Sequence, residues 1–153
     1  MTNKKILFLD LDGVLLPFGS YDDLDTRAML QKPLEFKEAL VERTPKNNID
    51  ALHKLGEDHI FVLISTWRYL VPDEMIEEYM SALDLWKYFH TERPIANYSV
   101  QYASKPQDIK KWMQVHDDDL SYEYLLIDDW DMTSENYSHV KQIITDPKVG
   151  YVG

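Results

Sequence analysis

The sequence contains no cysteine, is poor in basic residues and has no long apolar run. The absence of cysteine excludes disulfide bonds and thiolate metal ligands, and it agrees with a cytoplasmic location. No apolar run reaches the roughly 18 residues of a membrane-spanning helix, so we expect no membrane partner. The 16 lysines and arginines are outnumbered by 27 acidic residues, and the net charge is −11. This charge disfavours broad nucleic-acid binding, which requires a basic face.

No internal repeat, low-complexity tract or linker interrupts the chain, so we expect residues 1–153 to form one domain. Apolar, strand-like runs alternate with amphipathic segments, a pattern typical of an α/β fold with a parallel sheet. Strands are predicted over 5–9, 59–65, 122–129 and 139–145, with a short one at 87–91. Helices are predicted over 44–58, 72–83 and 105–116, with Thr44 as the N-cap of the first, and partly over 24–30 and 34–41.

Polar side chains follow the predicted strands at their carboxyl ends. Asp10 and Asp12 follow the first strand, Ser65 closes the second, and Asp128 and Asp129 close a later one. Because open α/β sheets bind ligands at this edge, we expect these groups to converge there. Crowded carboxylates repel one another unless a cation neutralises them. Oxygen donors without cysteine favour Mg²⁺, and the five histidines show no spacing typical of zinc ligands.

Four segments occur in the order "FLDLDGVL", "FVLIST", "SKPQDIKKW" and "LLIDDW". Together they resemble the four motifs of the haloacid-dehalogenase-like (HAD) superfamily of phosphatases, across residues 6 to 130. The resemblance implies a three-layer, doubly wound (Rossmann-like) sandwich with a mainly parallel sheet. It also implies a Mg²⁺-dependent phosphomonoester hydrolase that forms an aspartyl-phosphate. A phosphorylated partner is therefore expected, with a nucleotide or a nucleic-acid end among the candidate substrates.

The resemblance assigns catalytic and phosphate-binding roles to residues of these motifs. Asp10 would be the nucleophile, and Asp12 would protonate the leaving oxygen and then activate water. Ser65 would hydrogen-bond the phosphoryl oxygens, with Thr66 as the competing hydroxyl. Lys105, at the start of its predicted helix, would neutralise charge on the phosphoryl group.

The resemblance also implies a metal site. Mg²⁺ would be bound by Asp10, the backbone carbonyl of Asp12, Asp128 and Asp129. Without the other three motifs, Asp128 and Asp129 would also suit the cap of a following helix. Arg68, in the segment "STWR", is a candidate for substrate contact, although a structural ion pair is the favoured interpretation.

Neither the gap between the first and second motifs nor the gap between the second and third is long enough for a full cap domain, but residues 17–43 suit a small lid. Two other function classes compete. A receiver-like phospho-acceptor domain also combines acids, a hydroxyl and a lysine, but it places its acidic pair after the first strand, whereas here the pair comes late. A catalytically inactive HAD-fold binding module has no reason to keep both Asp10 and Asp12.

Overall fold

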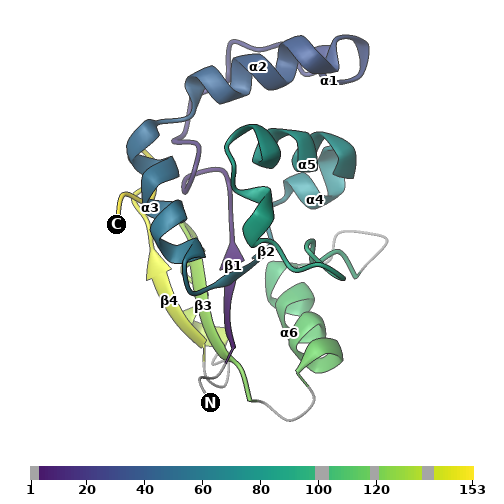
Figure 1. Cartoon of the computed structure of the whole chain (residues 1–153). Coiled ribbons are helices and arrows are strands. Elements are labelled where there is room, and N and C mark those ends of the chain that lie inside the picture. The colour runs from purple at the N-terminus through teal and green to yellow at the C-terminus, as the bar shows by residue number, and fades with distance from the viewer. Residues whose placement is uncertain (1–3, 99–103, 118–120, 136–139) are drawn as a thin grey trace.

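The computed structural model describes residues 4–98, 104–117, 121–135 and 140–153. Its sheet has the strand order β2-β1-β3-β4, and every neighbouring pair is parallel (Figure 1). The strands are β1 (Lys5–Leu9), β2 (Ile60–Leu63), β3 (Glu123–Asp128) and β4 (Val140–Ile144). β1 and β3 are the central strands, and the register pairs Leu9 with Ile127, so these two strands end side by side.

Helices connect and cover the strands in the described part of the chain. The α-helices are α1 (Ala28–Gln31), α2 (Pro33–Arg43), α3 (Lys46–Gly56), α4 (Trp67–Leu70), α5 (Asp73–Ala82) and α6 (Lys105–His116). The 3₁₀ helices are η1 (Trp86–Tyr88) and η2 (Thr133–Glu135). None of the helices that the structure describes has the length and apolar character needed to cross a membrane.

The alternation of β1 divides the core into two layers, because successive strand side chains point to opposite faces. Leu7 and Leu9 pack into a cluster with residues of α2, α3 and α5, whereas Phe8 packs into a second cluster with Trp112 of α6. In Figure 1, α3 and α6 accordingly lie on opposite sides of the strands. The predicted three-layer α/β sandwich with a parallel sheet is confirmed.

Residues 17–43 lie at the carboxyl end of the sheet. Figure 1 shows α1 and α2 beyond the tips of the strands, beside α4 and α5. Within this arrangement α2 packs against α5. The segment that the sequence suggested as a lid is therefore next to the strand ends that carry the predicted site.

The strand predicted at 87–91 is wrong. Trp86–Tyr88 is a 3₁₀ helix, and the described residues that follow it pair with the edge of β2 through isolated bridges at Phe89 and Ile95. Pro94 accepts a hydrogen bond from the Leu63 N–H at 2.7 Å but has no N–H of its own. A regular ladder therefore does not form along this edge.

The predicted N-cap role of Thr44 is also wrong. Pro45 is the N-cap residue of α3, and the buried Thr44 side chain makes no capping bond. Its hydroxyl instead donates to the carbonyl of Leu40 in α2 at 2.7 Å and lies 2.6 Å from the hydroxyl of Tyr79 in α5. Thr44 therefore links two helices of the layer that covers the sheet.

Candidate active site

Three carboxylates meet at the carboxyl ends of the central strands. One oxygen each of Asp10, Asp128 and Asp129 lies within 4.8 Å of the other two. Asp10 is 3% exposed and Asp128 is fully buried, and the N–H of Asp10 donates to the carbonyl of Ile127 at 3.1 Å. This donor set contains only carboxylate oxygens and therefore fits a hard cation such as Mg²⁺.

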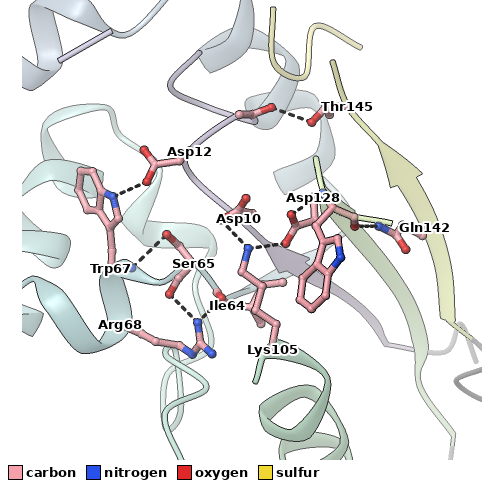
Figure 2. Close-up of polar contacts among 12 residues, drawn as sticks. Asp10, Asp12, Ile64, Ser65, Trp67, Arg68, Lys105, Asp128, Gln142 and Thr145 are labelled. Carbon is pink, nitrogen blue, oxygen red and sulfur yellow. Dashed lines mark hydrogen bonds and ion pairs between the residues drawn. The ribbon is translucent and has the colours of Figure 1, made fainter. Parts of the chain in front are cut away.

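Lys105 reaches the same cluster from the first turn of α6 (Figure 2). Its Nζ lies 2.7 Å from Asp128 Oδ2 and 3.3 Å from Asp10 Oδ1. The helix begins here because the Ser104 side chain accepts from the N–H of Gln107, and Pro106 suits a first turn. The cap and the proline thus fix where the lysine enters the site.

Burial and mutual repulsion perturb these charges. Burial raises the pKa of Asp10 to about 8, with a further increase from the negative charge of Asp128, while the Lys105 ammonium opposes the shift. Burial also raises the pKa of Asp128. Burial works against the Lys105 ammonium, but Asp10 and Asp128 outweigh it and raise the lysine pKa. One lysine thus leaves excess negative charge, which a cation would neutralise.

The turn after β1 brings Gly13 against Asp129. Gly13 has a φ of +82°, and a Cβ added to it would lie 2.8 Å from Asp129 Cγ. Its backbone is held on both sides, because its N–H donates to the Leu16 carbonyl at 2.8 Å and its carbonyl accepts from the Thr145 hydroxyl at 2.7 Å. Only a residue without a side chain fits this approach unstrained.

Asp12 is held by two donors from different segments. The Tyr21 hydroxyl donates to Asp12 Oδ1 at 2.6 Å, and the indole N–H of Trp67 donates to Oδ2 at 3.1 Å. Figure 2 shows the Asp12 carboxylate pointing toward the Trp67 indole. Burial and the neighbouring Asp12 raise the pKa of Tyr21. The sequence analysis identified neither partner, because no motif or spacing signal pointed to Tyr21 or to the Trp67 indole.

The two candidate hydroxyls differ in their surroundings. Ser65 is fully buried at the end of β2, and its Oγ accepts from the N–H of Trp67 at 3.2 Å. An acceptor role toward Trp67 leaves the hydroxyl hydrogen of Ser65 able to donate to a phosphoryl oxygen. Thr66 is exposed and forms the N-cap position of α4. Trp67 therefore contacts Ser65 through its backbone N–H and Asp12 through its indole N–H.

Arg68 lies in a buried ion pair. Its side chain is 1% exposed, and its Nε donates to Asp108 Oδ2 at 2.9 Å. Its Nη1 donates to the carbonyl of Ser65 at 2.8 Å, and the Tyr69 hydroxyl also donates to Asp108. This arrangement fits the structural ion pair rather than a substrate contact. Asp108 had no distinctive sequence signal, because an acid in the first turn of a helix is usually solvent-exposed.

No significant match to this chain was found among curated proteins or among solved structures. A protein-family model described as "HAD domain in Swiss Army Knife RNA repair proteins" matches residues 6–151. The match spans nearly all of the chain, including the strand ends and α6, and it agrees with the parallel three-layer sandwich. The chain therefore belongs to the HAD family, as a HAD domain of the kind found in Swiss Army Knife RNA repair proteins.

Proposed function

We propose that this chain is a Mg²⁺-dependent phosphomonoester hydrolase that acts through an aspartyl-phosphate on Asp10. The observation that carries the proposal is the buried cluster of Asp10, Lys105 and Asp128 at the ends of the central strands. Family membership supports a phosphatase-type hydrolase. The cluster adds a carboxylate nucleophile beside a cationic side chain, which is the arrangement that nucleophilic attack on an anionic phosphate requires.

In the first step, a carboxylate oxygen of Asp10 attacks phosphorus while the bond from phosphorus to the leaving oxygen breaks. Asp12 donates a proton to that oxygen, so the leaving group departs as an alcohol. Lys105 and the Ser65 hydroxyl hold the phosphoryl oxygens during the transfer. The products of this step are the alcohol and an acyl phosphate on Asp10.

In the second step, water attacks the phosphorus of the acyl phosphate. The Asp12 carboxylate takes a proton from that water, and the bond between phosphorus and the Asp10 oxygen breaks. Inorganic phosphate leaves, Asp10 is again a carboxylate, and Asp12 is again protonated. Asp12 thus acts first as acid and then as base.

Asp10, Asp128, Asp129 and the Asp12 carbonyl are the proposed Mg²⁺ ligands. When bound, Mg²⁺ would offset repulsion between the carboxylates and the phosphate and would stabilise charge on the phosphoryl oxygens. The close approach of three carboxylate oxygens, together with the raised pKa values of Asp10 and Asp128, supports this assignment.

The family description supports a phosphorylated nucleic-acid end or a nucleotide as substrate. The net charge of −11 disfavours extended contact with a polyanion. Recognition of one terminal phosphate needs only the local charges of the site. We also propose that residues 17–43 act as a lid within a single domain, because Tyr21 of this segment contacts Asp12.

The test is phosphate release from p-nitrophenyl phosphate and from RNA carrying a terminal phosphate, with Mg²⁺ and with EDTA. Asp10→Asn should lower turnover by at least about 10³-fold. Asp50→Asn, the same change at an exposed position of α3, should not change it. In Asp12→Asn, slow hydrolysis of the intermediate should add the mass of one phosphoryl group to the intact protein.

Each alternative has a distinct outcome in this assay. Activity retained in Asp10→Asn would move the nucleophile elsewhere, and turnover unaffected by EDTA would refute the metal role. If none of the substrates is hydrolysed in any condition, the inactive binding module becomes the better interpretation.

A further inference from the structure

A groove opens beside Asp12 between the segment that leads into α2 and the short helix α4. Its volume is about 440 Å³, within the usual range for small-molecule sites. The walls are mainly apolar and include Met29, Leu30, Phe36, Trp67, Leu70 and Val71. A second hollow of about 340 Å³ shares Met29, Leu30 and Leu70 with it and adds Tyr69 and Pro72. The groove therefore extends from the proposed general acid to the surface.

The position of Asp12 determines what this groove would hold. A general acid must lie within hydrogen-bond reach of the oxygen that it protonates. Asp12 lines the groove, and Tyr21 and Trp67, which also line it, hold both oxygens of its carboxylate. Asp12 also lines a separate hollow of about 420 Å³, together with Pro17, Phe18 and Asp22. The groove is the hollow that Trp67 lines as well, so we assign the group attached to the leaving oxygen to it.

The lining offers little to a sugar that carries no base, or to a second phosphate. Arg27 is the basic residue among the lining residues that the structure describes, and it is paired with Asp25 at 3.0 Å. A sugar phosphate without a base would present only hydroxyl-bearing surface to these walls and would leave them uncovered. In a nucleoside, the ribose carries the leaving oxygen beside Asp12, and the base is the part that reaches the apolar walls. A further phosphate would meet one partly neutralised cation in a strongly acidic protein.

A flat, largely apolar group fits the same walls better. Leu30 and Leu70 are 78% and 74% exposed, so a ligand that covers them removes apolar surface from water. Trp67 and Phe36 also line the groove, but each is only 5% exposed, so a base would cover mainly the side chains of Leu30 and Leu70. The family model that matches the chain describes HAD domains in RNA repair proteins, which agrees with a nucleoside as the attached group.

We propose that this groove is the leaving-group subsite and that it takes a nucleoside, either from a mononucleotide or from the end of a nucleic acid. The inference rests on the proposed phosphatase function. It assigns substrate selection to Leu30 and Leu70, from the segment 17–43 and from α4 respectively.

The experiment compares kcat/KM, with Mg²⁺, for adenosine 3′- and 5′-monophosphate, ribose 5-phosphate, phosphotyrosine and a short RNA with a terminal phosphate. The unmodified protein should prefer nucleotides over ribose 5-phosphate by more than tenfold. In the double variant Leu30→Ser/Leu70→Ser, this preference should fall about tenfold, or about 1.4 kcal/mol. The replaced leucines are largely exposed, so the core stays filled. The matched control is Leu34→Ser, at 59% exposure outside the groove, and it should keep the preference.

The outcomes separate this inference from the proposed function. Equal use of nucleotides and ribose 5-phosphate, or an unchanged preference in the double variant, would overturn the groove assignment. Hydrolysis that still depends on Asp10 would then leave the phosphatase proposal standing. Phosphotyrosine as the best substrate would overturn the choice of a nucleoside. Failure to hydrolyse every substrate would overturn both proposals. Preference for RNA or for mononucleotides would each support the inference and would identify the source of the nucleoside.

Discussion

Replacing Gly13 with alanine should damage the proposed metal site while most of the fold survives. Alanine at the left-handed φ of +82° costs about 1–2 kcal/mol. The new Cβ would also lie 2.8 Å from Asp129 Cγ and 3.0 Å from Asp129 Cβ. Rotation of the Asp129 side chain moves Cγ but leaves Cβ in place. Because Leu16 and Thr145 hold the Gly13 backbone, Asp129 must move away from the cluster.

The matched control is Gly19→Ala. Gly19 also has a left-handed φ, +87°, but an added Cβ would meet its nearest atom, Asp22 Oδ2, at 3.7 Å. Both variants therefore have a similar backbone cost, equivalent to a decrease in Tm of roughly 2–8 °C for a domain of this size. In Gly13→Ala alone, we expect Asp129, one of the three proposed carboxylate ligands, to be displaced.

The assay is thermal unfolding across a Mg²⁺ series, since a ligand that binds the native state raises Tm. The unmodified protein and Gly19→Ala should show the same Mg²⁺ concentration at half of the maximal rise. Gly13→Ala should need at least about tenfold more Mg²⁺, a free-energy difference of about 1.4 kcal/mol. An unchanged Mg²⁺ midpoint in Gly13→Ala would refute the inferred link between this glycine and the metal site.

Three further predictions follow from the site. Trp67→Phe removes one of the two donors to Asp12, so kcat/KM should fall about tenfold or more for alkyl phosphates. It should fall little for p-nitrophenyl phosphate, whose leaving group needs no proton, and equal losses for both substrates would contradict this role. Arg68→Met leaves Asp108 buried without this partner and should lower the free energy of unfolding, measured by urea titration, by about 3–5 kcal/mol. The double variant Arg68→Met/Asp108→Leu should recover much of the lost stability. In EDTA, folded Asp10 keeps its proton up to about pH 8, while the unfolded chain loses it near pH 4. The free energy of unfolding should therefore decrease by up to about 1.4 kcal/mol per pH unit as pH rises through this interval, and Tm should decrease with it. Asp10→Asn should flatten this decrease.

The main features of the site follow from short-range patterns. Apolar runs that end in acids predicted where Asp10 and Asp128 would lie, because parallel strands in register end at the same edge. The start of α6 at Lys105 follows from a serine cap and Pro106.

Contacts that depend on the path of a loop had no comparable signal. The donation from Tyr21 to Asp12 depends on how residues 17–43 fold back over the strand ends, which periodicity does not encode. The segment 87–91 has the composition of a strand, but its Phe89 stacks on the preceding Trp86 with ring centroids 4.9 Å apart, and its Tyr88 closes a 3₁₀ helix. Tertiary packing there outweighs β-propensity.

The central position of β1 has a consequence for how the protein folds during synthesis. β1 is made before both of its neighbours, and its residues from Ile6 to Leu9 are fully buried in the finished sheet. One neighbour, β2, ends at Leu63, while β3 begins only at Glu123, so about 60 residues separate them. At the usual translation rate of about 5–20 residues per second, one edge of β1 stays unpaired for roughly 3–12 s before β3 is synthesised. Chaperone protection of the nascent chain would matter most during that interval.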